Sequence, residues 1–271
     1  MTVRHSGFGV GIVFALSLGA AASLTAQEPE KSVVAVVRFD NDTGDERYDN
    51  LGRAMSSMMI SDLSVIERIQ LVERERMEEV MAEQNLQYSG RVDEETAVTL
   101  GMIVGAQYMV FGSFLTMDPE MRIDTRVTKT ETAEIVTTAD VRGQNQSLFD
   151  LQQQLADTLI AGFELVLTEE ERSLLRAQQE ANRIDDVDTM IAFSEALCLL
   201  DYGAYPEAFE AIQRVQSAAP GSQIVGATFS LLRDRAADDA RNRVTDGVRS
   251  RLGGLIGRDI PAPARERPAA C

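Results

Sequence analysis

Three blocks of sequence decide the fold: IQLVERERMEEVMAEQNL at 69–86, GRVDEETA at 90–97 and LGMIVGAQYMVFGSF at 100–114. The apolar, β-branched start of the first block predicts a strand at 69–72. Met77, Val80 and Met81 follow at the spacing of one helical face and predict a helix. Asp93 precedes Glu94 and Glu95, which is typical of an N-capped helix. The third block predicts a strand at 107–115, so the stretch reads strand, helix, helix, strand.

These blocks resemble, in order and spacing, the CsgG-type domain of bacterial envelope proteins, the family of the curli production assembly/transport component CsgG and HfaB-like proteins. The family patterns LVERERL, EQ.L..SG.VD..TA..LG and GA.Y.V.GS correspond to Leu71–Met77, Glu83–Gly101 and Gly105–Ser113. The resemblance implies an α/β fold with a mixed sheet. It also implies roles in outer-membrane secretion or assembly, or in flagellar or cell-wall processes.

The flanking sequence predicts the rest of an α/β (α+β) domain over residues 31–167. Residues 121–129 alternate polar and apolar side chains, which is typical of a sheet with one face in water. Where the family has a Thr-Gly turn, this chain has Thr130–Ala133. The predicted order is β-α-β-α-α-β-β-β-α, a mixed β-sheet with helices packed against it. Its strands lie at 33–37, 69–72, 107–115, 121–129 and 133–141, and its helices at 48–66, about 77–83, 94–102 and 148–167.

Residues 168–251 predict a helical region that begins with Thr168 as an N-cap. Gly203, Tyr205, Ala208 and Pro220 match the spacing of a tetratricopeptide repeat, which places a helical hairpin at about 189–220. We find no second copy, and a stable array needs about three repeats. One hairpin with a following helix, docked on the first domain, is therefore favoured over a peptide-binding solenoid. The proline-rich residues 252–271 predict a disordered tail.

The amino terminus is typical of a secretory signal peptide over residues 1–26. Arg4 is followed by an uncharged apolar run over 7–22 and then by small residues up to Ala26. This run is short for a membrane-spanning helix, which needs roughly 20 residues, so cleavage after Ala26 is favoured over an uncleaved anchor. No Cys follows the run, which argues against a lipid anchor. We therefore expect a soluble periplasmic protein.

The formal net charge is −17, and it becomes −18 without residues 1–26, because these contain one charged residue, Arg4. Nucleic acids and anionic lipids attract Lys and Arg patches. The strongly acidic balance therefore argues against a nucleic-acid partner and against direct membrane insertion.

The composition argues against an enzyme. The one histidine, His5, lies in the predicted signal peptide, so the mature chain lacks the His of Ser/His/Asp and Cys/His sites and of most zinc sites. Cys198 is expected to be a reduced core residue and Cys271 a solvent-exposed thiol, although export would permit a disulfide. We predict no catalytic, cofactor-binding or metal-binding residues, and no cofactor.

Other patterns have ordinary interpretations. Residues 40–46 (DNDTGDE) superficially resemble a calcium loop, but an EF-hand needs Glu at position 12, which is Leu51. A solvated turn is favoured. The charged run 73–83 is expected to be an exposed helix face. For Met55–Met59, a stripe of core residues is favoured over a surface that contacts a partner. Gly101, Gly105 and Gly112 do not form a phosphate loop, because no Gly-Lys-Ser/Thr follows.

The resulting hypothesis is a non-enzymatic periplasmic protein of the CsgG-like family that acts by protein–protein contact in outer-membrane-associated assembly or secretion. Its partners in the cell envelope are unknown, and a homo-oligomer remains open. The alternative is a subunit of a curli-type outer-membrane secretion channel. A charged face of Arg122, Asp124 and Arg126 could not meet lipid, and only Met117–Glu120 joins the two strands, so the channel is the second hypothesis.

Overall fold

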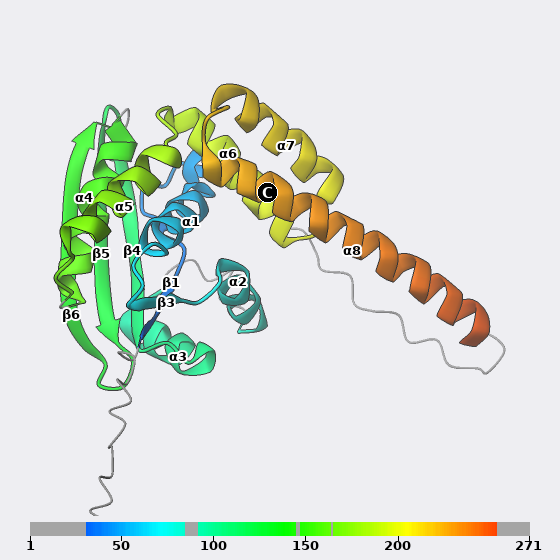
Figure 1. Cartoon of the computed structure of the whole chain (residues 1–271), viewed down its shortest axis with the longest axis horizontal. Helices are drawn as coiled ribbons and strands as arrows, with labels where there is room; N and C mark the ends of the chain where they lie inside the picture. Colours follow the sequence, from blue (N-terminus) through cyan, green and yellow to red (C-terminus); the bar gives the residue numbers. More distant parts are fainter. Residues whose placement is uncertain (1–30, 85–91, 145–146, 164, 254–271) are drawn as a thin grey trace, which may run out of the picture. The chain divides into compact units, whose positions relative to one another are not determined.

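The sheet has six strands in mixed orientation. The structure, a computed structural model, describes residues 31–84, 92–144, 147–163 and 165–253. The strand order is β3-β1-β4-β5-β6, with β2 paired to β4 as well. β1 runs parallel to β3 and β4, whereas β4, β5 and β6 form an antiparallel meander (Figure 1). The strands are β1 (Ser32–Val36), β2 (Asp40–Asn41), β3 (Ile69–Leu71), β4 (Tyr108–Met117), β5 (Glu120–Lys129) and β6 (Glu134–Gln144).

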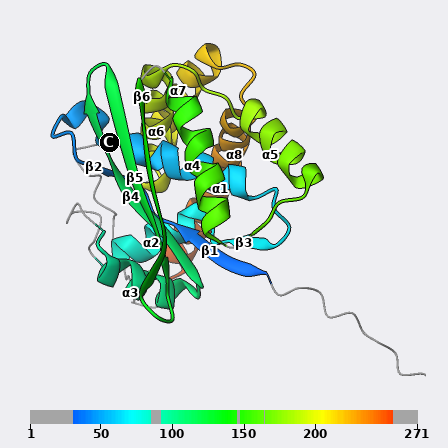
Figure 2. The same ribbon diagram turned by 90° about the vertical axis from the view of Figure 1, so that its left-hand side faces the viewer.

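Eight α-helices lie in the described part of the chain: α1 (Leu51–Leu63), α2 (Arg74–Glu83), α3 (Glu94–Val104), α4 (Leu148–Gly162), α5 (Glu169–Ala181), α6 (Val187–Asp201), α7 (Tyr205–Ala218) and α8 (Gln223–Gly253). α1 and α4 pack on one face of the sheet, and α2 and α3 pack on the opposite face of β1 and β4. Figure 2 looks onto the β6 side and shows α4 along the sheet. The mixed α/β fold predicted from the sequence is confirmed; β2 and a short 3₁₀ helix (Glu46–Tyr48) are additions.

The larger hydrophobic core continues from the sheet into the helical region. It joins Val110 and Ile123 of the sheet and Met55 of α1 to Phe193 of α6 and Ile212 of α7. A smaller core under α2 and α3 contains Met77, Leu100 and Phe111. The described residues from Lys31 onward accordingly form one compact unit. The division into domains at residue 167 stays a prediction.

The predicted helix starts are confirmed at two positions. The Asp93 carboxylate accepts a hydrogen bond from the Thr96 N–H at 2.9 Å and caps α3. Thr168 and Glu171 form a capping box at the start of α5, in which each side chain bonds to the backbone of the other residue. Both caps satisfy N–H groups that have no partner inside a helix.

Several element boundaries differ from the prediction. The helix expected over 148–167 ends at Gly162, and α5 begins soon after it. The strand expected over 133–141 runs from Glu134 to Gln144. Its turn places Ala133 at φ 56°, the left-handed conformation in which a family glycine would be unstrained.

α6 and α7 form the predicted helical hairpin. Gly203 occupies the turn at φ 72°, a backbone conformation that favours glycine. Ala196 and Ala208 are buried in the hairpin. Its assignment to the tetratricopeptide class stays a prediction, as does the signal peptide at 1–26, which lies outside the described residues. The predicted tail from residue 252 lies almost wholly outside them.

Two further observations concern chemistry and membranes. Cys198 is fully buried and disulfide-bonded, so the expected free thiol in the core is wrong. The other cysteine of the chain, Cys271, lies outside the described residues. Within the described residues, no helix combines the length and the apolar character that crossing a membrane requires.

Candidate functional site

One face of β5 and β6 is not covered by a helix in the described structure. α4 packs on the other face, where Ile123, Val127 and Val141 are buried. The side chains of Arg122, Asp124, Thr138, Asp140 and Arg142 therefore lie on the uncovered face, which we call the open sheet face. The alternation predicted a sheet with one face in water, and this is confirmed.

The open sheet face contains a hollow of about 550 Å³ between the strands and the start of α3. Its lining comes from the four strands β2, β4, β5 and β6, the residue after β2 and the loop before α3, so residues far apart in the sequence share one surface. The lining residues are Asp40, Asp42, Val92, Asp93, Phe111, Gly112, Ser113, Arg122, Asp124, Thr125, Arg126, Thr138, Ala139 and Asp140.

Ion pairs run across this face from β5 to β6. Arg122 Nη2 lies 2.6 Å from Asp124 Oδ1 and 2.6 Å from Asp140 Oδ2. Arg142 Nε lies 3.0 Å from Asp140 Oδ1. The hydrogen bond from Arg142 is the main reason that the pKa of Asp140 is lowered, and the charge of Arg122 adds to it. The ion pairs hold these side chains in place on the face.

The rim of the hollow is acidic and partly ordered by backbone contacts. Asp40 is buried, and its Oδ2 accepts a hydrogen bond from the Val92 N–H at 2.9 Å. Asp93 is the cap of α3, and hydrogen bonds from Thr96 lower the pKa of its carboxyl. On the opposite side, Arg126 Nη1 lies 3.7 Å from Glu94 Oε1. The hollow is therefore a polar surface with carboxylates in excess.

The turn at 40–46 has the local geometry of a capped loop. Asn41 Nδ2 donates to the Asp45 carbonyl at 2.9 Å and to Asp49 Oδ1 at 2.8 Å. The Asp45 carboxylate accepts from the Arg47 N–H and starts the 3₁₀ helix. Across the described residues, no group of three His, Cys, Asp or Glu side chains is placed to hold a metal ion.

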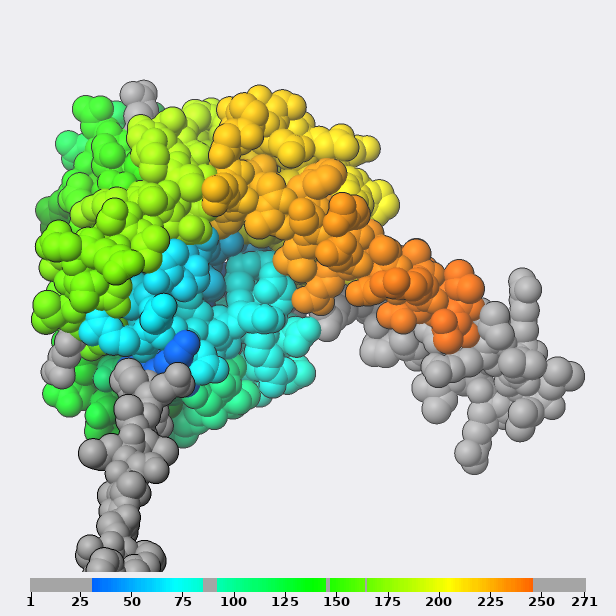
Figure 3. Space-filling model, in the orientation of Figure 1, coloured from blue at the N-terminus to red at the C-terminus, as the bar shows by residue number. Residues whose placement is uncertain are grey.

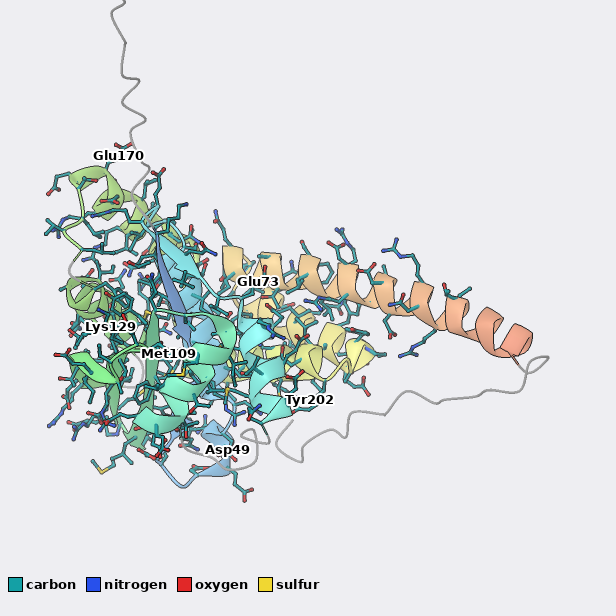
Figure 4. The ribbon with its side chains drawn as sticks, turned by 90° about the horizontal axis from the view of Figure 1, so that it is seen from below. Asp49, Glu73, Met109, Lys129, Glu170 and Tyr202 are labelled. Carbon is teal, nitrogen blue, oxygen red and sulfur yellow. The ribbon has the colours of Figure 1, made fainter. Side chains whose placement is uncertain are left out.

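The charged run at 73–83 is not a uniformly exposed face, and that prediction is wrong at Arg74. This side chain is 6% exposed, and its Nη1 lies 2.6 Å from Oδ2 of Asp201 on α6. Arg53 of α1 and Glu78 of α2 complete the cluster. Glu73 and Tyr202, which flank Arg74 and Asp201, are labelled in Figure 4. A hint in the sequence is the carboxylate of Asp201 directly after the apolar run 196–200.

The structure also shows where the methionine stripe and Gly112 lie. Met55, Met58 and Met59 are each about 1% exposed, so this stripe is core. Gly112 lies inside β4, where a Cβ atom would come 2.1 Å from the Asp124 carbonyl oxygen on β5. This glycine is therefore required by a close approach of two strands.

Known proteins resemble part of this chain. Residues 17–122 match the model of a family described as "Curli production assembly/transport component CsgG". No curated protein sequence matches the chain. The C-terminal domain of LpoB from Salmonella enterica is a similar solved structure, with 21% identity, coverage of 43% of this chain and 84% of that chain, and a TM-score of 0.35.

Two other solved structures have lower identity. The LpoB C-terminal domain from Escherichia coli is 18% identical and covers 45% of this chain and 90% of that one, at a TM-score of 0.32. A PelC dodecamer from Paraburkholderia phytofirmans is 12% identical and covers 48% of this chain and 86% of that one, at a TM-score of 0.29. The sequence match supports a protein of the cell envelope. The similarity to the CsgG family therefore rests on residues 17–122.

Proposed function

We propose that this chain is a non-enzymatic periplasmic protein that acts by protein–protein contact in outer-membrane-associated assembly or secretion. The family match of residues 17–122 supports the envelope context. The absence of histidine after His5 supports a binding role, because most acid–base and nucleophilic sites use this residue.

The observation that carries the proposal is the open sheet face. A sheet face in water, with charges held by cross-strand ion pairs, presents a rigid pattern to a partner. Such a pattern gives specificity and a fast association rate through complementary charge. The carboxylates around the hollow favour a partner segment that carries Lys or Arg, whereas an acidic partner would be repelled.

The experiment is affinity capture from envelope extracts with the full-length exported protein, followed by mass spectrometry. Asp140→Arg breaks the ion pairs to Arg122 and Arg142 and replaces a carboxylate of the face with a guanidinium group, which repels a basic segment. Glu195→Arg, in the exposed ion pair with Arg214, makes the same charge change elsewhere and serves as the control. We expect Asp140→Arg to lose the main captured protein and Glu195→Arg to retain it. Equal capture by both variants, with unchanged circular dichroism, would reject this face as the contact surface.

The alternative function is a subunit of a curli-type outer-membrane secretion channel. It is favoured by the family description, which includes a transport component. Purified exported protein added to planar bilayers distinguishes the two functions. We expect no stepwise ion conductance and no flotation with liposomes, because anionic headgroups repel a chain of net charge −18. Stepwise conductance without detergent would make the channel the first hypothesis.

A further inference from the structure

Four charged side chains from three helices meet in the protein interior. Arg53 comes from α1, Arg74 and Glu78 from α2, and Asp201 from the last turn of α6. Their side chains are only 5%, 6%, 11% and 8% exposed, respectively. In Figure 3, the surface of α2 (cyan) borders that of the C-terminal helices (yellow to orange).

Asp201 is the centre of the cluster. Its Oδ2 accepts a hydrogen bond from Arg74 Nη1 at 2.6 Å and lies 3.4 Å from Arg53 Nε. Arg74 Nη2 donates to Glu75 at 2.8 Å, and Arg53 Nη2 lies 3.5 Å from Glu78. Arg53 Nη1 also donates to Asn50 at 3.0 Å. Two guanidinium groups and two buried carboxylates therefore balance one another.

The electrostatics of the cluster couple the helices. Burial raises the pKa of Asp201, while the positive charges of Arg74 and Arg53 act to lower it. Burial disfavours the charged form of Arg74, but the charge and hydrogen bond of Asp201, together with the charges of Glu75 and Glu78, outweigh this and raise the pKa of the guanidinium. Each of these buried charges is therefore stable only while the helix that carries its counter-charge is packed beside it.

An apolar contact alone would hold α6 less specifically. Hydrophobic packing is non-directional, so α6 could rotate or slide on α1 at a small cost. A buried ion pair instead penalises every arrangement that leaves one charge without its partner, and it can specify a single docking geometry. Arg74 lies in the block LVERER (71–76), which is not part of the open sheet face proposed as the contact surface.

We propose that Arg53 and Arg74 form a socket for Asp201 that fixes the α6–α7 hairpin in one orientation on the α/β core. The socket accepts a helix whose C-terminal turn carries a carboxylate, and in this chain that helix is α6. The hairpin is then a fixed part of the molecule and not a mobile appended module.

The opposite end of α6 supplies a matched control. Asp188, in the first turn of α6, pairs with Arg47 in an ion pair whose two side chains are 53% and 66% exposed. Exposed pairs contribute little to stability. Both pairs tie the same helix to the α/β core, so they differ chiefly in burial.

The test is hydrogen–deuterium exchange on the full chain, with peptides from α6–α7 compared with peptides from β4–β5. In Arg74→Met, we expect exchange in α6–α7 to become at least about tenfold faster, while β4–β5 changes less. The double variant Arg74→Met, Asp201→Leu removes both charges. We therefore expect its equilibrium constant for unfolding to be roughly a hundredfold smaller than that of Asp201→Leu alone. Its α6–α7 exchange stays faster than in the wild type, because the apolar pair no longer specifies orientation.

Arg47→Ala and Asp188→Ala should leave exchange in α6–α7 within about twofold of the wild type. Equal acceleration of α6–α7 and β4–β5 in Arg74→Met would overturn the proposal, since the cluster would then support only global stability. Additive effects of Arg74→Met and Asp201→Leu would overturn it as well, because partners in one socket must couple.

Discussion

Arg74 and Asp201 are 127 positions apart in the chain, and their side chains form a hydrogen-bonded ion pair of 2.6 Å in the interior. The pair joins α2 to the end of α6 in the C-terminal hairpin. It therefore links two helices that are distant in the sequence.

Removing one partner of this pair should be strongly destabilising. Asp201→Ala leaves the guanidinium of Arg74 buried without its main counter-charge, which costs about 3–5 kcal/mol of unfolding free energy. Urea denaturation followed by circular dichroism measures this value. Asp188→Ala, at the exposed end of the same helix, should lose less than about 1 kcal/mol. Similar losses for the two variants would contradict the buried role of Asp201.

Asp62 should make stability decrease as the pH rises. This side chain is 3% exposed between α1 and α5, and burial raises the pKa of its carboxyl to about 7. The polar side chains of Asn182 and Gln179 act to lower the pKa and offset only part of that shift. Below about pH 4 the carboxyl is protonated in both the folded and the unfolded state. Between about pH 4 and 7 the unfolded state ionises first, so folding loses up to about 4 kcal/mol.

Asp62→Asn should therefore be more stable than the wild type at pH 8, by about 2–4 kcal/mol, and nearly equal to it at pH 4. Denaturant midpoints across this range measure the difference. Glu67→Gln removes an exposed carboxylate near the end of α1 and should show no such trend. A constant difference between Asp62→Asn and the wild type at all pH values would refute the buried-carboxyl interpretation.

Gly112→Val should destabilise the sheet. The new Cβ would lie 2.1 Å from the Asp124 carbonyl oxygen, so strands β4 and β5 would have to separate. We expect a loss of about 3 kcal/mol, the upper end of the overpacking range, and a lower melting temperature. Gly226→Val is the control, because a Cβ at Gly226 has nothing within 4 Å. An unchanged melting temperature for Gly112→Val would mean that the strand is placed wrongly.

Ala133→Gly should stabilise the β5–β6 turn. Ala133 has φ 56°, which costs an L-residue with a side chain roughly 1–2 kcal/mol, whereas glycine adopts it freely. Glycine also loses more conformational entropy on folding than alanine does. The net increase in the free energy of unfolding should therefore be about 0.5–1 kcal/mol. Ala177→Gly, in the exposed middle of α5, should instead lose about 1 kcal/mol. Thermal unfolding of both variants decides the sign.

Export should produce a chain that begins at Gln27. The apolar run over 7–22 and the small residue Ala26 motivate this cleavage site. Intact-mass measurement of the periplasmic fraction tests it. Ala26→Trp, which places a large residue at the cleavage position, should leave the precursor uncleaved. Wild-type protein found in the membrane fraction with residues 1–26 intact would show an anchor.

Much of the fold was predictable because it depends on local patterns. The two caps at Asp93 and Thr168, the alternation along β5 and the turn at Gly203 each depend on residues close together in sequence. The open sheet face was predicted from the alternation of Arg122, Asp124 and Arg126. Its hollow was not, because Asp40, Phe111 and Asp140 meet there only through strand pairing.

The sequence by itself determined the mixed α/β fold, the similarity of residues 17–122 to the CsgG family and the helical hairpin, because periodicity, capping and turn chemistry act over a few residues. Only the tertiary structure decided which charges are buried. Arg74 and Arg76 are two positions apart in one helix, yet Arg74 is 6% exposed and Arg76 is 51% exposed. The difference arises because the side chain of Arg74 meets Asp201 in the last turn of α6, and this carboxylate, 127 residues away, compensates the desolvation of the buried guanidinium.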